Sequence, residues 1–244
     1  MIFFSYVRKT YKMKNNKSHI VLLFSLSVLA LLPFSCKKEK VDTPKMHLNY
    51  FGLTPGRFVT YEVLEVFHDN DVLVAHDTLR YQLKTVIGNE FIDNNGRTAR
   101  EFKRFKRNSS SAPWVVSDLW TAIIENYKAE LVEENQRIIK LVFSPTEDKI
   151  WNPNTYNSLP SAEFNYENIH ASVTLNNISF DSTLIVRQGY FKSLIDYQNA
   201  SEIYATNIGL VSKSYKNLKI ANFDTLNVKK GYEIHYKCLG YGFE

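Results

Sequence analysis

Apolar and polar residues alternate along much of the chain that follows residue 56. Residues 57–68 read RFVTYEVLEVFH and residues 78–87 read TLRYQLKTVI, and both segments are rich in β-branched and aromatic residues. This composition with a period of two is typical of strands. The intervening HDND favours a turn. The pattern therefore predicts a hairpin of two strands.

The same alternation recurs to the end of the chain. The turn Asp93-Asn94-Asn95-Gly96 is the clearest hairpin signal, because Asn-Gly readily adopts positive φ angles. A second polar turn is expected at 133–136. Further strands are expected at 97–107, 114–127, 138–143, 164–175, 183–191, 208–215 and 231–239. About ten strands with closely spaced turns predict an all-β or mainly β fold, built as a curved antiparallel sheet, a half-barrel or a barrel.

One or two short helices are also expected. The candidates are 118–128, as an alternative to the strand expected there, and 196–204, which is favoured by the apolar spacing of Tyr197, Ala200, Ile203 and Tyr204. Residues 145–163 contain three prolines and several asparagines. They are expected to form one long loop that crosses an edge or the mouth of the sheet.

The segment before the strands predicts export. Residues 20–32 read IVLLFSLSVLALL, an uncharged run that is too short for a membrane-spanning helix of about 20 residues. Basic residues precede it and small or polar residues follow, which is the layout of a signal peptide at 1–35, with Met13 as the better start. A buried core helix would need a polar face, which this run lacks.

The signal ends in PFSCKKEK, which resembles the precursors of Bacteroidetes lipoproteins. The resemblance implies cleavage before Cys36 and acylation of Cys36 by chains such as palmitate. Ser35 fits the small residue expected before the cut, whereas Pro33 departs from the usual leucine. Residues 36–45 would then be a lipidated tether and 46–244 a single β-rich domain. Lys37 places no acidic residue after the cysteine, which by resemblance implies the outer membrane.

A disulfide between Cys36 and Cys238 after ordinary signal cleavage is the alternative, since the chain has two cysteines. If Cys36 carries lipid, Cys238 is expected to be a small buried apolar residue, because it lies in an alternating segment.

A looser resemblance covers the mature chain. Residues 203–213 read IYATNIGLVSK, and Gly56, Tyr61 and Val63 match an opening strand pattern. Both resemble uncharacterised Bacteroidetes lipoproteins, a family with no assigned reaction to transfer. A more distant likeness is to the half-barrels of lipoprotein carriers.

Charge excludes one class of partner. The formal net charge is +5, but residues 1–35 hold five basic residues and no acidic one: Arg8, Lys9, Lys12, Lys14 and Lys17. Without them the chain has 25 basic and 25 acidic residues. The mature protein is neutral, so nucleic acid is not an expected partner.

Candidate chemistry is sparse. The chain has no G-x-S-x-G, P-loop or dinucleotide-binding glycine pattern. Glu62 and Glu65 fall on opposite faces of a strand, and nothing in the sequence marks Glu133 and Glu134 as a catalytic pair. Among the metal-ligand types, His68, Asp69, Asp71, His76 and Asp77 crowd one hairpin. A solvated hairpin end explains them, and no metal or cofactor is expected.

Basic and aromatic residues are read mainly as structural. The run at 103–107 alternates over two strand faces, which favours a solvated edge. Trp114, Trp120 and Trp151 either fill a core or line a ligand surface. Three Asp-Ser/Thr pairs resemble the O-glycosylation signal of exported Bacteroidetes proteins and mark Thr78, Ser182 and Thr225 as candidate sites.

The sequence therefore predicts a membrane-tethered lipoprotein of the cell envelope. Its expected role is non-catalytic binding of a lipid, a glycan or an envelope protein. A glycan hydrolase with carboxylates brought together by the fold, or a structural envelope protein, are the alternatives.

Overall fold

The computed structural model describes residues 44–244, so the predicted signal peptide and Cys36 lie outside the described residues. Residues 44–244 form one compact unit of twelve strands and a single short 3-10 helix, η1 (Leu48–Phe51). The strands are β1 (Arg57–Asp69), β2 (His76–Ile92), β3 (Thr98–Arg107), β4 (Val115–Glu125), β5 (Lys128–Glu133), β6 (Gln136–Val142), β7 (Ile150–Trp151), β8 (Phe164–Leu175), β9 (Ile178–Lys192), β10 (Asp196–Ala205), β11 (Gly209–Ala221) and β12 (Asp224–Phe243).

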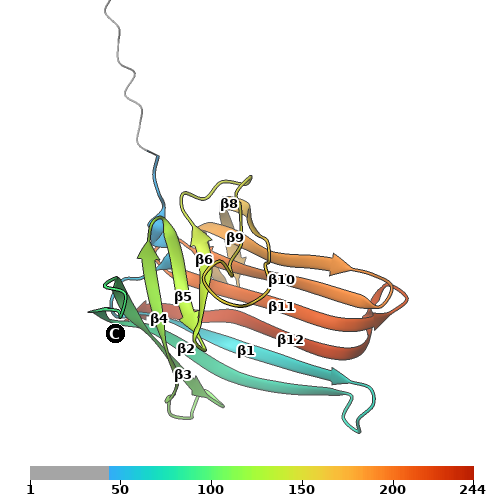
Figure 1. Cartoon of the computed structure of the whole chain (residues 1–244). Helices are drawn as coiled ribbons and strands as arrows, with labels where there is room; N and C mark the ends of the chain where they lie inside the picture. The colour runs from blue at the N-terminus through green and yellow to red at the C-terminus, as the bar shows by residue number, and fades with distance from the viewer. Residues whose placement is uncertain (1–43) are drawn as a thin grey trace, which may run out of the picture. The chain divides into compact units, whose positions relative to one another are not determined.

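All twelve strands belong to one antiparallel sheet with the order β6-β5-β4-β3-β2-β1-β12-β11-β10-β9-β8-β7. The first and last long strands pair at its centre, where Tyr61 lies opposite Cys238. Figure 1 shows the long strands side by side, with β4, β5 and β6 standing steeply across one end of them. The sheet curves around a filled interior, as a twisted antiparallel sheet of this size does.

The two edges of the sheet meet along a seam made by β6 on one side and β7 and β8 on the other. The Ile139 amide donates to the Pro153 carbonyl at 2.9 Å, and the Trp151 indole donates to the Ile139 carbonyl at 3.1 Å. The Tyr166 hydroxyl lies 2.7 Å from the Val142 amide and 2.9 Å from its carbonyl. The barrel is thus closed by single hydrogen bonds and side chains in place of a continuous ladder.

Four hairpins turn on two residues that both have positive φ angles. They are Asn126–Tyr127, Glu134–Asn135, Asn176–Asn177 and Asn222–Phe223. This is the type I′ geometry, whose twist matches that of the flanking strands, and asparagine tolerates it best after glycine. These turns set the register of β5, β6, β9 and β12.

The predicted all-β fold is confirmed, with twelve strands in place of about ten. The helix predicted at 196–204 is wrong, because these residues form most of β10. Its inward positions are Ala200, Glu202 and Tyr204, which alternate once the buried glutamate is counted. The alternative helix at 118–128 is also wrong, because it spans β4, a turn and the start of β5. Strand β5 itself was not predicted.

The predicted loop at 145–163 contains the short strand β7 and crosses the seam. Besides Pro153, Asn157 reaches the opposite edge, where its side-chain amide donates to the Arg137 carbonyl at 2.9 Å. The expectation of a loop that crosses an edge is therefore confirmed.

One end of the interior is covered by η1. Tyr50 is completely buried, and its hydroxyl lies 2.7 Å from His170 Nδ1 and 2.8 Å from Ser182 Oγ. After η1 the chain turns at Gly52 with a φ of 65°, where an added Cβ would come within 2.5 Å of the Ile208 carbonyl oxygen. Gly52 is required here because both the conformation and the close approach exclude a side chain.

The interior is filled by two apolar clusters, one beside the seam around Tyr166 and Trp151, the other around Tyr61 and Leu83. Cys238 belongs to the second cluster and is completely buried, as predicted for a small apolar residue. Burial raises the pKa of its thiol to about 11. Within residues 44–244, no helix is both long and apolar enough to cross a membrane.

Candidate functional site

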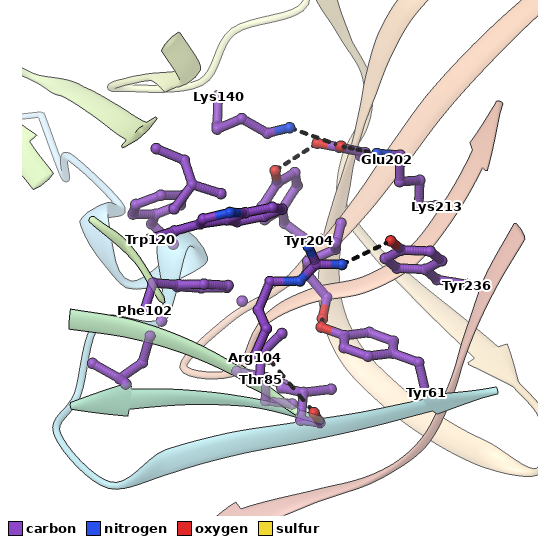
Figure 2. A pocket seen from close by; sticks show the side chains of 18 of the residues that line it. Tyr61, Thr85, Phe102, Arg104, Trp120, Lys140, Glu202, Tyr204, Lys213 and Tyr236 are labelled. Carbon is purple, nitrogen blue, oxygen red and sulfur yellow. Dashed lines mark hydrogen bonds and ion pairs between the residues drawn. The ribbon is translucent and has the colours of Figure 1, made fainter. Parts of the chain in front are cut away.

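The interior holds a cavity between the two apolar clusters and beneath η1. Its free volume is about 70 Å³. It is lined by residues of β1 to β6, β10, β11 and β12, and Figure 2 shows them converging from opposite walls. The polar lining is formed by Arg57, Thr85, Arg104, Glu133, Lys140, Glu202 and Lys213, and the aromatic lining by Phe51, Tyr61, Phe102, Trp120, Tyr204 and Tyr236.

Charged groups meet in one wall of this cavity. Lys140 Nζ lies 2.9 Å from Glu202 Oε1 and 3.4 Å from Glu133 Oε1. The Tyr204 hydroxyl donates to Glu202 Oε2 at 2.6 Å, so both carboxylate oxygens of Glu202 have a partner. Lys213 Nζ lies 4.0 Å from Glu202 Oε1, which is beyond hydrogen-bond distance.

The ion pair keeps both of its members charged inside the protein. Burial would raise the pKa of Glu202, but Lys140 and then Lys213 attract the carboxylate and bring its pKa to about 2. Burial opposes the charge of Lys140, yet Glu202 and Glu133 raise its pKa above the ordinary value. For Lys213, burial outweighs the attraction of Glu202, so its pKa is lowered.

Arg104 lines the adjoining part of the cavity. Its guanidinium donates to Asp118 at 3.0 Å and to the Tyr236 hydroxyl at 3.3 Å. The guanidinium carbon also lies 4.0 Å from the centre of the Trp120 ring. These contacts satisfy two of the five N–H groups of the arginine and hold it flat against an aromatic face.

Aromatic side chains form the apolar part of the lining. The rings of Phe102 and Trp120 stack with their centroids 6.2 Å apart, and the ring centroids of Tyr61 and Tyr236 are 5.6 Å apart. Of the predicted tryptophans, Trp120 lines the cavity, Trp151 fills the core at the seam, and Trp114 lies against Arg107. The core role expected of tryptophan is confirmed for Trp151, whereas a ligand surface at Trp120 stays a prediction.

The predicted carboxylates are only partly brought together. Glu62 is exposed, whereas Glu65 accepts a hydrogen bond from Tyr81, so the two lie on opposite faces as predicted. Glu133 does reach the cavity, where it faces Glu202 across Lys140. Sequence reasoning missed Lys140 and Glu202, although a lysine inside the apolar run IIKLVF was an available signal.

The basic run at 103–107 lies on a central strand, because β3 pairs with both β2 and β4. The predicted split over two faces is confirmed: Arg104 points into the cavity and Lys103 pairs with Glu101. The predicted solvated edge is wrong for Arg104, which is more than nine-tenths buried.

The histidine-rich hairpin is an ordered network. His68 and His76 lie opposite each other, with Nδ1 atoms 2.8 Å apart, and His68 Nε2 lies 3.1 Å from Glu233. His235 and Lys216 also contact Glu233, at 2.9 and 2.8 Å. Among residues 44–244, no three His, Cys, Asp or Glu side chains are placed to hold a metal ion.

The three candidate glycosylation sites differ in exposure. Thr78 is exposed on β2, and Thr225 is partly exposed at the start of β12. Ser182 is partly buried, and its hydroxyl bonds to Tyr50. Glycosylation at each site stays a prediction.

Three hairpin tips at the end of the long strands expose large apolar residues. These hairpin tips, β1–β2, β9–β10 and β11–β12, carry Val72, Leu73, Val74, Leu194, Ile195, Phe223 and Leu226. The Phe223 amide bonds to the Leu194 carbonyl, and the Asn70 amide bonds to the Lys229 carbonyl, so the tips lie together. Figure 1 shows this end opposite the end covered by η1.

Comparisons with known proteins add little to this geometry. No protein-family model and no curated protein matches the chain. A Parabacteroides distasonis structure provisionally described as a lipoprotein shares 11% identity, with a TM-score of 0.43 over 82% of this chain and 100% of its own. A Bacteroides fragilis structure provisionally described as an exported protein with a YmcC-like fold shares 10% identity, with a TM-score of 0.41 over 78% and 98%. Similarities this slight carry no argument about function.

Proposed function

We propose that the protein is an exported, lipid-anchored protein of the cell envelope that binds a small ligand inside its barrel without catalysing a reaction. The cavity is the observation that carries this proposal, because it combines a stacked aromatic wall with a few converging charged groups. Such a mixture is typical of ligand sites. The signal segment and the lipoprotein-like PFSCKKEK support the location, with the outer membrane as the expected site.

The same site argues against Glu202 as the general acid of a glycan hydrolase. A glycosidase needs one carboxyl group that stays protonated at neutral pH as well as one that is ionised. Here Lys140 lies between Glu133 and Glu202. Burial alone would raise the pKa of Glu202, but the attraction of Lys140 and Lys213 lowers it to about 2. Glu202 therefore lacks the proton that a general acid must donate.

The ligand itself is the test of this proposal. Full-length protein would be purified from its native envelope in a non-ionic detergent, and bound small molecules would be identified by mass spectrometry. In Thr85→Phe the larger side chain fills the cavity, whereas Thr98→Phe adds the same ring at an exposed strand position. A molecule that accompanies wild type and Thr98→Phe but not Thr85→Phe supports binding. Identical recoveries from all three proteins contradict it.

One observation favours a second function, docking to an envelope partner. The three hairpin tips expose Leu73 and Leu226 almost completely, and contiguous exposed apolar residues often mark an interaction surface. Leu73→Lys combined with Leu226→Lys would then abolish recovery of a partner protein in a pull-down, while Thr85→Phe would leave it unchanged. Loss of the partner in Thr85→Phe alone would assign recognition to the cavity.

A further inference from the structure

The cavity retains hydrogen-bond donors that the protein does not use. Each carboxylate oxygen of Glu202 accepts one hydrogen bond, from Lys140 or from Tyr204, and the Lys213 ammonium lies 4.0 Å away without a hydrogen bond to it. Arg104 also borders Tyr236, with its guanidinium 3.3 Å from the hydroxyl, while Lys213 Nζ is 5.6 Å from the ring centre. Figure 2 shows Arg104, Tyr236 and Lys213 as neighbours around the same space.

Arg57 adds a third incomplete donor. Among the described residues, its buried Nε has no hydrogen-bond partner, although the guanidinium carbon lies 3.8 Å from the centre of the Phe243 ring. A buried N–H without an acceptor is costly, so it favours an acceptor supplied from outside the chain.

The charges around the cavity do not balance. The lining holds four cations, Arg57, Arg104, Lys140 and Lys213, against Glu133 and Glu202. Asp118, which binds Arg104 from outside the lining, brings the carboxylates to three. One positive charge remains, which is the complement of a monoanion.

The size of the cavity and its aromatic wall restrict the size and polarity of the rest of the ligand. At about 10–15 Å³ for each water centre, a free space of about 70 Å³ corresponds to roughly five to seven waters. That suits a compact organic molecule. The stacked rings of Phe102 and Trp120 offer a flat apolar surface for its body.

We infer that the cavity binds a small organic monoanion, with its acid group between Lys213 and Arg104 and its apolar body against Phe102 and Trp120. This inference rests on the proposed function and names the class of ligand. The anion would supply the acceptors that Lys213 and Arg104 lack, and it would reduce the repulsion between these cations.

The experiment compares three probes of one shape and different charge. Phenylacetate, phenylacetamide and phenethylamine would be titrated into the full-length protein in non-ionic detergent by isothermal calorimetry. Phenylacetate is expected to bind about tenfold to a hundredfold more tightly than the other two, as for hydrogen bonds to a charged group. Equal binding of the three probes, or a preference for the amine, would overturn the inference.

Variants of Lys213 test whether this residue causes the preference for phenylacetate. Lys213→Met is expected to reduce phenylacetate binding to the level of the amide, and Lys213→Arg to retain it. Lys216→Met is the matched control, because Lys216 lies on the same strand and pairs with Glu233 of the histidine network. An unchanged preference in a folded Lys213→Met protein would contradict the assignment. If Lys213→Met does not fold, the three-probe comparison on wild type decides.

Failure of the inference and failure of the proposed function give different results. A ligand recovered from the native protein that carries no acidic group leaves the binding function standing and overturns the monoanion. Recovery of no ligand, together with no binding of any probe, overturns both.

Discussion

Lys140 on β6 and Glu202 on β10 form a buried ion pair across the barrel, although β7, β8 and β9 lie between their strands. The Nζ–Oε1 distance is 2.9 Å, and both residues are more than nine-tenths buried. A pair of this kind adds little net stability when both members are present, but loss of one member leaves a buried charge without a partner. The pair joins two strands, β6 and β10, that are not neighbours in the sheet.

Removal of one partner should be far more harmful than removal of both. Lys140→Met in the domain of residues 46–244 is expected to lose about 3–5 kcal/mol of unfolding free energy. Lys140→Met with Glu202→Gln should recover part of this loss. Lys219→Met is the control, since its exposed pair with Asp196 is worth at most about 1 kcal/mol. Urea unfolding followed by circular dichroism measures all four proteins, and an unaffected Lys140→Met would refute the role of the pair.

Stability should fall in acid because of Glu202. Its pKa is about 2 in the fold against an ordinary 4.5, since burial is outweighed by Lys140 and Lys213. A depressed carboxyl pKa contributes stability that is complete above about pH 4.5 and is lost as the pH falls toward 2; the shift corresponds to about 3 kcal/mol. Urea midpoints at pH 6, 4 and 3 should decline in wild type and decline less in Glu202→Gln. Parallel slopes would show that other groups cause the loss.

Two glycines allow the cost of a left-handed backbone conformation to be distinguished from the cost of a steric contact beside η1. Gly52 and Gly96 have φ angles of 65° and 74°, but only Gly52 has backbone atoms within 4 Å of an added Cβ. Gly96→Ala should therefore cost about 1–2 kcal/mol for the left-handed conformation alone. Gly52→Ala should cost clearly more, because Ile208 must also move. Equal losses in urea unfolding would mean that η1 shifts freely.

Anchoring through Cys36 is tested by cell fractionation. The short apolar run that ends in Phe34-Ser35-Cys36 predicts acylation. Cys36→Ser should release the protein from the membrane fraction and change its mass, whereas Cys238→Ser should leave membrane attachment intact. A Cys36→Ser protein that stays membrane-bound at unchanged mass would exclude the lipid anchor.

Exposure ranks the candidate glycosylation sites. Thr78 should carry a glycan more readily than Ser182, because Thr78 is exposed and the Ser182 hydroxyl bonds to Tyr50. Intact-mass measurement of Thr78→Ala, Ser182→Ala and Thr225→Ala from the native host checks this order. A mass loss confined to Ser182→Ala would reverse it.

The fold was largely predictable because alternation survives wherever the inward residues are apolar. In β1 the inward Val59, Tyr61 and Val63 mark the strand directly. In β10 the inward set includes Glu202, which any polar–apolar reading assigns to the surface, so the remaining apolar residues gave a false helical spacing. Turns were missed for a related reason: Asn126–Tyr127 and Asn222–Phe223 hold large residues at positive φ, where glycine is the usual signal.

The candidate site was much less predictable than the fold. Its charged members come from β1, β3, β5, β6, β10 and β11, and no spacing along the chain connects them. Lys140 and Glu202 are 62 positions apart, and their meeting depends on how far the sheet curves and where it closes. Curvature follows from twist and bulges summed over twelve strands, which a local pattern does not encode.

The seam has a kinetic consequence for this barrel. From β6 round to β8, neighbouring strands are joined by longer ladders, whereas the two-residue strand β7 pairs with β8 only through Ile150 and Trp151. Between β6 and β7 the wall depends on the Ile139–Pro153 hydrogen bond and on the side chains of Trp151 and Tyr166. Regions with few backbone hydrogen bonds open locally at lower free energy than the rest of a structure. Amide hydrogens of residues 139–153 should therefore exchange with solvent sooner than those of β1 and β12. A ligand would then enter the interior through this side of the wall.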